Sequence, residues 1–435
     1  MASSSKVPSG RLARFSSLAG LAGKLAGGML AEGARRMANG EKSNRLDLLL
    51  TPSNIKRVTD KLAHMRGAAM KLGQLLSMDA GDLIPAELAE LLARLRDNAN
   101  PMLPKQLATV LRTELGNDWQ RHFADFEFKP MAAASIGQVH RAQHDKGQRL
   151  AVKVQYPGVK QSIESDVDNV ASLLKISGLL PAGMDYGALL DEAKIQLQRE
   201  ADYLQEADYM TRFYHHLQHD PRYVVPQPNT ELSTANILVM DFVEGVPVES
   251  LQAEPQALRD QVMVLLFELF FKELFEFRLV QTDPNFANYR YNLSTKQLVL
   301  LDFGACRDYS EAFSDAYRLL FGSALNNQEA GVEQAMRDIG FFSQDIAASQ
   351  RERILQLVQL ACEPLQHSEP FDFGHSDLAN RIREAGTALS LQHNYWHTPP
   401  ADAIFLHRKI GGLYLLAARL KARVNVRALL QAYLD

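Results

Sequence analysis

The segment Asp283-Pro284-Asn285-Phe286-Ala287-Asn288, followed by Leu298-Val299-Leu300-Leu301-Asp302-Phe303-Gly304, decides the fold that we expect for this chain. Asn288 stands five residues after Asp283, a spacing that lets the aspartate meet an incoming nucleophile while the asparagine amide oxygen ligates a metal. Asp302 ends an apolar strand, and its carboxylate is a hard oxygen ligand suited to Mg²⁺ on a triphosphate. We therefore predict Asp283 as a catalytic residue, Asn288 and Asp302 as metal ligands, and ATP and Mg²⁺ as cofactors.

Upstream of this segment, Ala151-Val152-Lys153-Val154-Gln155 has the alternation of a strand, which points Lys153 to the face opposite Val152 and Val154. A lysine that faces inward needs anionic neighbours, and phosphate oxygens together with a helix carboxylate would supply them. Taken alone, the string fits a solvent-facing strand lysine better. With the downstream segment it predicts Lys153 as a catalytic and cofactor-binding residue.

The candidate carboxylates for Lys153 are Glu200, Asp202 and Glu206, which we expect on one helix over residues 186–216. Glu206 lies four residues after Asp202 and therefore on the same helix face. An exposed acidic face is the alternative, because charge runs are usually solvated. Glu200 and Glu206 are both predicted to bind the cofactor, and the spacing leaves open which of them pairs with Lys153.

A strand lysine, a helix glutamate, an Asp-x4-Asn loop and an Asp-Phe-Gly string occur in the same order in protein kinases. This order predicts an α+β fold: a bilobal protein-kinase-like fold with a small N-lobe sheet, a helical C-lobe and a helical N-terminal extension. The N-lobe should span residues 121–245. Within it we expect strands at residues 126–128, 137–142 and 150–155 and inserted helices at residues 157–180 and 186–216.

The end of the expected N-lobe is an edge strand at residues 235–241 that leads into a hinge. Met240, in this strand, is predicted to contact the nucleotide. The C-lobe should span residues 246–435 and be helical from residue 255 onward, apart from the strand at residues 298–303.

The N-terminal part divides into a segment at residues 1–44 and a helical extension at residues 45–120. No stretch reaches the 18 uninterrupted apolar residues of a spanning helix. The Ala/Gly/Leu-rich run at residues 18–31 is too short to span, and Lys24 interrupts it, so we expect an amphipathic helix that lies at a membrane interface or packs on a partner. An ordinary surface helix or a disordered tail is the alternative.

Two departures from protein kinases stand out. Met131-Ala132-Ala133-Ala134-Ser135-Ile136-Gly137 replaces the glycine-rich loop over the phosphates. Because alanine restricts φ where glycine does not, this loop should be stiffer, and we predict that residues Ala132, Ala133, Ala134 and Ser135 bind the cofactor. After Asp302 the sequence becomes helical again near Ser310, with no Ala-Pro-Glu string. A platform that docks peptide substrates is therefore not expected.

The Ala-rich loop, Lys71-Leu72-Gly73-Gln74, Glu200-Ala201-Asp202 and Gln281-Thr282-Asp283-Pro284-Asn285 together resemble the UbiB family, the aarF-domain atypical kinases of coenzyme Q biosynthesis. The resemblance runs from about residue 45 to the end of the chain. It implies that the helix carrying Lys71 and Gln74 lies over the active site, contacts the Glu-x-Asp carboxylates and occludes protein docking. Lys71 and Gln74 are accordingly predicted to be cofactor-binding residues.

The chain differs from many bacterial members of the UbiB family. The chain lacks the C-terminal membrane spans of many bacterial members, and its Gln-Thr-Asp-Pro-Asn loop is closer to the mitochondrial-type branch. The resemblance implies an ATPase that supports ubiquinone biosynthesis at a membrane surface. A small-molecule or lipid kinase that acts on a prenylated phenol or isoprenoid is the second candidate, and a nucleotide-regulated scaffold is the third. Expected partners are ATP, a membrane lipid or ubiquinone precursor, and other ubiquinone-biosynthesis proteins.

The composition argues against two other classes of protein, nucleic-acid-binding and disulfide-rich proteins. A net charge of −4 and a pI of about 6.3 give no overall basic field, so a nucleic-acid partner is not expected. The two cysteines, Cys306 and Cys362, exclude a disulfide framework and suit a reducing compartment. We expect a cytoplasmic protein, peripheral on the inner face of the membrane. Cys306 should be a small buried residue.

Overall fold

The computed structural model describes residues 67–68, 101–134, 136–176, 187–283, 285–342, 346–392 and 400–434. The chain divides into two compact units. Unit one comprises Met1–Asp208 with Gln227–Phe242, and unit two comprises Tyr209–Pro226 with Val243–Asp435. Of the predicted helices before residue 100, only Gly67 and Ala68 lie within the described residues, and both are helical.

Unit one is built on a five-stranded antiparallel sheet in the order β1-β3-β4-β6, with β2 paired to β3. Its strands are β1 (Phe123–Phe126), β2 (Ala132–Ala133), β3 (Gly137–His144), β4 (Arg149–Gln155) and β6 (Ile237–Asp241). A turn at residues 145–147 joins β3 to β4, and Gly147 there has a φ of 90°, which glycine adopts without strain.

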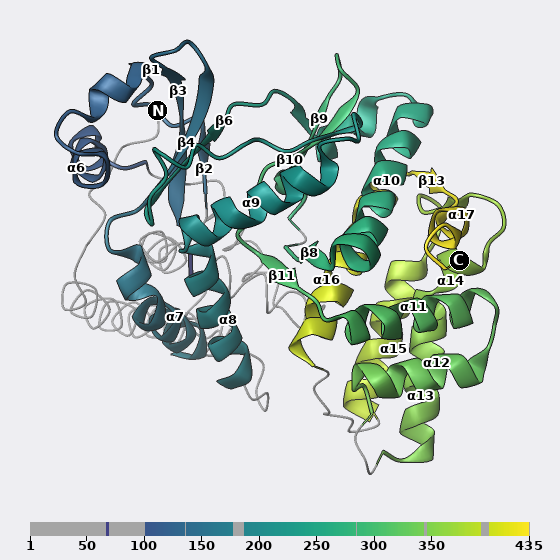
Figure 1. Cartoon of the computed structure of the whole chain (residues 1–435). Coiled ribbons are helices and arrows are strands. Elements are labelled where there is room, and N and C mark those ends of the chain that lie inside the picture. Colours follow the sequence, from purple (N-terminus) through teal and green to yellow (C-terminus); the bar gives the residue numbers. More distant parts are fainter. Residues whose placement is uncertain are drawn as a thin grey trace, which may run out of the picture. The chain divides into compact units, whose positions relative to one another are not determined.

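One face of this sheet forms a hydrophobic core with helix α6 (Pro104–Leu115), which lies beside the strands in Figure 1. This helix lies within the predicted helical extension and is followed by Gly116, whose φ is 91°. The core residues that β4 contributes are Leu150, Val152 and Val154. Alternation along β4 therefore turns Ala151, Lys153 and Gln155 to the opposite face.

Three helices of the chain follow β4: α7 (Val159–Ile176), α8 (Gly187–Glu200) and α9 (Tyr203–Leu217). The predicted single helix over residues 186–216 is wrong, because α8 ends at Glu200 and α9 begins at Tyr203. Asp202 causes the break: its Oδ1 accepts a hydrogen bond from the Gln205 backbone N–H at 3.2 Å, as an N-cap side chain does.

Unit two has a four-stranded sheet in the order β5-β10-β9-β7 and two pairs of short strands, β8 with β11 and β12 with β13. The sheet contains β5 (Tyr223–Val224), β10 (Gln297–Leu300), β9 (Tyr289–Asn292) and β7 (Val246–Pro247). The paired strands are β8 (Leu279–Gln281), β11 (Cys306–Asp308), β12 (Phe371–Asp372) and β13 (Arg423–Val424). The expectation of one strand after residue 255 is wrong, since strands of two to four residues are too short to show alternation.

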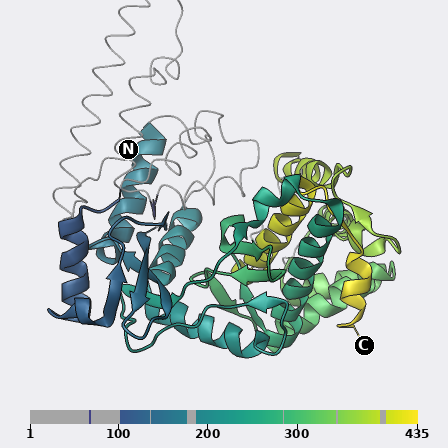
Figure 2. The same cartoon turned by 90° about the horizontal axis from the view of Figure 1, so that it is seen from above.

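The helices of unit two form its core. They are α10 (Gln256–Phe271), α11 (Glu311–Leu325), α12 (Glu329–Ile339), α13 (Ala348–Ala361), α14 (Glu363–Gln366), α15 (Leu378–Gln392), α16 (Ala401–Arg419) and α17 (Val426–Gln431). α10 continues as one π-helical segment, Lys272–Phe277, which ends at Arg278 with a φ of 51°. Figures 1 and 2 show α16 beside α10. α11 begins next to Ser310, near the start that the sequence predicted, and the Ser310 side chain caps it.

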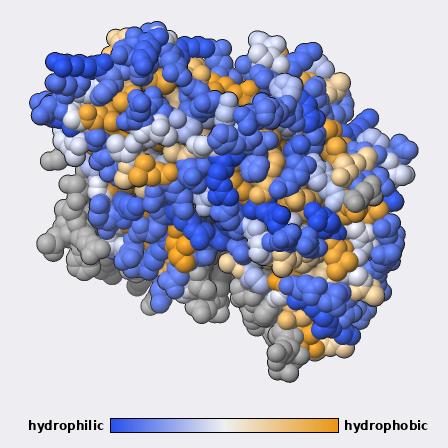
Figure 3. Space-filling view, in the orientation of Figure 1, coloured by the Kyte–Doolittle hydropathy of each residue, from blue (hydrophilic) through white to orange (hydrophobic). Residues whose placement is uncertain are grey.

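Helix length and surface hydropathy are the two features that concern membrane contact. Among the residues that the structure describes, no helix is long and apolar enough to cross a membrane. On the face drawn in Figure 3, hydrophobic residues form small patches separated by hydrophilic ones. The predicted amphipathic run at residues 18–31 lies outside the described residues.

Candidate functional site

Lys153 of unit one forms a buried ion pair with Glu206. Its Nζ lies 2.7 Å from Glu206 Oε1 and 2.9 Å from Oε2, and the side chains are 10% and 0% exposed. The ammonium group also lies 5.1 Å from the centre of the Tyr203 ring, within the range of a cation–π contact. The structure thus pairs Lys153 with Glu206, while Glu200 is the half-buried last residue of α8.

The register of β4 and the start of α9 bring these two side chains together. β4 is a central strand in which Lys153 pairs with Val139 of β3 and Leu238 of β6. Gln155, on the same face of β4, donates from Nε2 to the backbone oxygens of Ala201 at 3.0 Å and Ala235 at 3.2 Å. It therefore fixes the α8–α9 junction from which α9 carries Glu206.

Gln155 is a residue beside the candidate site that the sequence interpretation missed. The signal was present in the sequence, because a polar residue two positions after Lys153 faces the same side of the strand.

The Ala-rich loop packs against β3. Ala132 and Ala133 form β2, and both are exposed. The Ala134 N–H donates to Gly137 O at 3.0 Å, and Ser135 lies outside the described residues. A Cβ on Gly137 would lie 2.3 Å from the Val154 backbone oxygen, so the position excludes any side chain.

Met240 lies on the same face as Lys153. It pairs with Ala151 across β4 and β6, and cross-strand partners share a face of the sheet. Met240 is buried, and residue 228 bridges to it from the other side. Beside the lysine, this face therefore has an apolar surface formed by Ala151 and Met240.

Asp283 and Asn288 of unit two are bonded directly to each other. Asn288 Nδ2 donates to Asp283 Oδ2 at 3.1 Å. Asp283 Oδ1 accepts from the Asn285 N–H at 3.3 Å. Because the Asn288 amide nitrogen faces the aspartate, its amide oxygen is the atom of this side chain that could ligate a metal.

The segment that carries Asp302 is tied to the same loop. The Leu301 N–H donates to Asn288 O at 3.0 Å, and Thr282 donates to Ala305 O from both its N–H and its Oγ1. Asp302 Oδ1 accepts from the Gly304 N–H at 3.0 Å. Phe303 is fully buried against Phe213, with ring centres 5.0 Å apart. These contacts fix the backbone on both sides of Asp302.

Asp302 and Asn288 offer the hard oxygen atoms that magnesium prefers. Within the described parts of the chain, no cluster of three or more His, Cys, Asp or Glu side chains could hold a metal. Mg²⁺ usually takes only one or two protein ligands and completes its shell with phosphate oxygens and water. Asp302 and Asn288 could supply such a pair.

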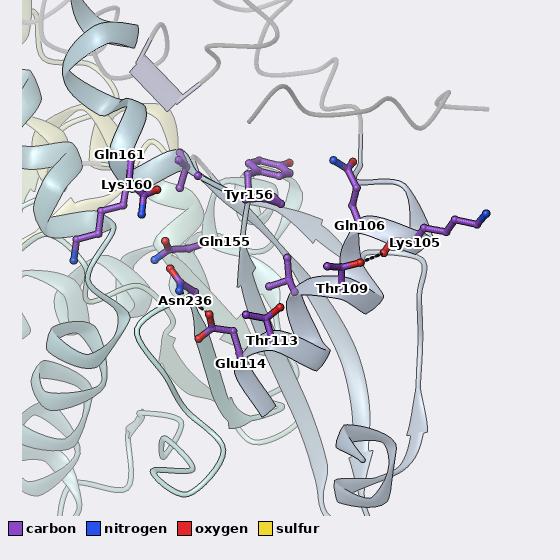
Figure 4. A pocket seen from close by; sticks show the side chains of 14 residues that line it. Lys105, Gln106, Thr109, Thr113, Glu114, Gln155, Tyr156, Lys160, Gln161 and Asn236 are labelled. Carbon is purple, nitrogen blue, oxygen red and sulfur yellow. Dashed lines mark hydrogen bonds between the residues drawn. The ribbon is translucent and has the colours of Figure 1, made fainter. Parts of the chain in front are cut away.

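A separate pocket of about 430 Å³ lies where α6 meets the connection from β4 to α7 (Figure 4). Its lining includes neither Lys153 nor Glu206. Lys105 and Lys160 stand at its two ends with their ammonium groups pointing apart, and Lys160 is 3.6 Å from Asp202. Its cations therefore do not converge as a triphosphate site requires.

Lys71 and Gln74, which the sequence assigned to the cofactor, lie outside the described residues, as does Ser135. Cys306 and Cys362 are both buried free thiols, as expected for Cys306.

Comparison with known proteins agrees with this architecture. Residues 94–336 match the model of the ABC1 atypical kinase-like domain. The chain is 37% identical over 426 residues to "Atypical kinase COQ8B, mitochondrial" of Danio rerio, an alignment covering 97% of this chain and 68% of that protein. It is 37% identical over 424 residues to "Atypical kinase COQ8, mitochondrial" of Saccharomyces cerevisiae, covering 97% and 84%.

A solved structure also resembles the chain. The Rv3197–erythromycin complex from Mycobacterium tuberculosis aligns with a TM-score of 0.60 and 25% identity, covering 87% of this chain and 95% of that one. The mixed helix and strand fold of the kinase-like class, predicted from the order of the motifs, is thereby confirmed.

Proposed function

The chain belongs to the ABC1 atypical kinase-like family, the UbiB family that its motifs resemble, and from this we propose that it is a magnesium-dependent ATPase supporting coenzyme Q biosynthesis. Membership makes the chain an enzyme of the atypical kinase type. The observation that supports nucleotide chemistry best is the buried Lys153–Glu206 pair. Kinases use such a pair to hold a lysine against nucleotide phosphates.

In this proposal the residues of unit one bind the nucleotide. Lys153 contacts the α- and β-phosphates and Glu206 orients its ammonium group. Met240 and the Ala-rich loop, Ala132 to Ala134, contact the rest of the nucleotide. Ser135, Lys71 and Gln74 keep the roles expected from the sequence, and Glu200 contributes from the end of α8.

The residues of unit two act on the metal and the nucleophile. Asp302 and Asn288 would hold Mg²⁺, which when bound neutralises charge on the phosphates. Asp283 orients the attacking group, and its bond to Asn288 fixes both side chains in one conformation.

A small acceptor suits this enzyme better than a protein. Between Asp302 and the start of α11 at Glu311, the chain has room only for the short strand β11, which pairs with β8. Protein kinases use a longer activation segment at this place to dock peptides. The acceptor would thus be water, which makes the protein an ATPase, or a prenylated phenol, which would make it a small-molecule kinase.

Coenzyme Q precursors are lipids, so we place the reaction at a membrane surface. The relatives from D. rerio and S. cerevisiae are named mitochondrial. Contact through residues 18–31 would be peripheral and salt-sensitive, because Lys24 and the flanking arginines meet anionic headgroups.

Phosphate release from Mg-ATP by the purified full chain tests the proposal. The wild type should release phosphate when water is the only acceptor, and anionic liposomes should raise the rate. In Lys153→Met the rate should fall to background. A chain deleted of residues 1–40 should lose the liposome response. Transfer of the γ-phosphate to an added prenylated phenol would favour the kinase instead. Nucleotide binding without turnover under every condition would favour a scaffold.

A further inference from the structure

A second buried ion pair lies in unit two, outside all of the motifs considered so far. Lys409 of α16 is 3% exposed and Glu273 of the π-helical segment is 0% exposed. The Lys409 Nζ lies 3.0 Å from Glu273 Oε2. Burial of two charges is expensive, and an apolar pair of similar volume is often at least as stable. The pair therefore calls for an explanation other than stability.

The ammonium group of Lys409 also reaches both ends of the Asp283–Asn288 loop. It donates to the backbone oxygen of Gln281 at 2.9 Å and to the Tyr289 hydroxyl at 2.6 Å. Gln281 precedes the loop and Tyr289 follows it directly. The Tyr289 hydroxyl in turn donates to Gln281 Oε1 at 3.1 Å, which ties the two ends to each other.

The protonation state of Lys409 suits this role. Burial would lower the pKa of the Lys409 ammonium, but attraction to Glu273 and Tyr289 and the bonds to them outweigh burial and raise the pKa. Lys409 is therefore charged at neutral pH, with two hydrogen bonds and one ion pair. Its three neighbours are Glu273, the Gln281 carbonyl and the Tyr289 hydroxyl.

We propose that Lys409, held by Glu273, is a positioning residue that fixes the two ends of the Asp283–Asn288 loop and so sets the catalytic geometry. The inference rests on the proposed function, because it takes Asp283 and Asn288 as the groups being positioned. The bonds of Lys409 are to Gln281 and Tyr289, so it acts on Asp283 and Asn288 only through the ends of the loop. Its effect is on the loop, which could otherwise shift by fractions of an ångström.

The test variant replaces both charges at once, Lys409→Met with Glu273→Gln, so that no unpaired charge stays buried. The expected result is a melting temperature near that of the wild type, an unchanged KM for ATP, and a kcat lower by about 10- to 100-fold. Tyr414→Phe is the matched control. It removes a hydrogen bond of the same helix, from the Tyr414 hydroxyl to Ala361 O at 2.9 Å, which does not reach the loop. This control should keep its kcat.

A folded double variant with wild-type kcat would overturn the inference, and so would an equal loss of kcat in Tyr414→Phe. If the double variant does not fold, Tyr289→Phe decides, since it keeps the ion pair but breaks the bond that ties the loop ends. It should lower kcat by about threefold or more at unchanged KM, and full activity would refute the inference.

Hydrogen exchange separates this inference from the proposed function. Amides of residues 281–289 should exchange faster in the double variant than in the wild type or Tyr414→Phe, whether or not the protein hydrolyses ATP. If the wild type releases no phosphate, the proposed function is refuted but the positioning role is not. If residues 281–289 exchange equally fast in the double variant and the wild type, the positioning role is refuted but the proposed function is not.

Discussion

Removing the Lys153–Glu206 pair tests the central contact of unit one. At separations of 2.7 and 2.9 Å, and with both side chains almost fully buried, two unit charges attract by roughly 6 kcal/mol at an effective dielectric constant of about 20. The loss of solvation offsets much of this attraction in the native pair. A single substitution loses the attraction but leaves one charge buried.

We therefore expect Lys153→Met and Glu206→Gln each to lower the free energy of unfolding by about 3–5 kcal/mol. The double variant should lose much less than the sum of the two, because neither charge stays buried without its partner. The coupling energy from this cycle should be at least about 2 kcal/mol. Urea denaturation of the four proteins measures it.

Lys194 and Asp168 provide a matched control cycle. They are also 2.7 Å apart, but their side chains are 24% and 58% exposed. Water screens such a pair, so its coupling energy should stay below about 1 kcal/mol. Equal coupling in the two cycles, or additive losses for Lys153 and Glu206, would refute the conclusion that burial makes this pair strong.

Three further predictions concern separate features. Asp302→Asn should keep the fold but lose the thermal stabilisation that Mg-ATP gives the wild type, and equal stabilisation in the variant would rule out Asp302 as a metal ligand. Gly137→Ala should destabilise unit one by about 1–3 kcal/mol in urea, because its Cβ would lie 2.3 Å from Val154 O, whereas Gly411→Ala, with no atom within 4 Å, should not destabilise. Contacts with Phe341 and Tyr317 partly desolvate the His407 ring and lower its pKa, so the unfolded state binds a proton first as the pH falls; stability should drop more between pH 6.5 and 4 in the wild type than in His407→Gln, and parallel curves would contradict this.

Features that depend on neighbours in sequence were predictable. Alternation along Ala151 to Gln155 gave the strand and the face on which Lys153 lies, because the side-chain period of a strand is fixed by its backbone. The Asp283–Asn288 spacing indicated two side chains within reach, and they are bonded at 3.1 Å. The order of the motifs indicated the kinase-like fold, which the comparisons confirm.

The choice of Glu206 over Glu200 required the tertiary structure. Spacing on one helix could not separate them, and the helix is in fact broken at Asp202, whose side chain caps α9. Gln155 then holds the junction through a contact 46 residues away in sequence. Such a contact depends on how β4 and α8 pack, which no local pattern encodes.

The contacts that hold the Asp283–Asn288 loop show even more clearly what local sequence cannot predict. Lys409 lies 128 residues from Gln281 and 120 from Tyr289, in a helix with three other charged residues, Asp402, Arg408 and Arg419, whose sequence gives no sign of which one is buried with a partner. The sequence by itself determined which residues we propose for the chemistry, since their types and spacings are those that the proposed reaction requires. Only the tertiary structure decided what holds them, because a buried charge selects its partner by packing, and packing joins segments of any separation.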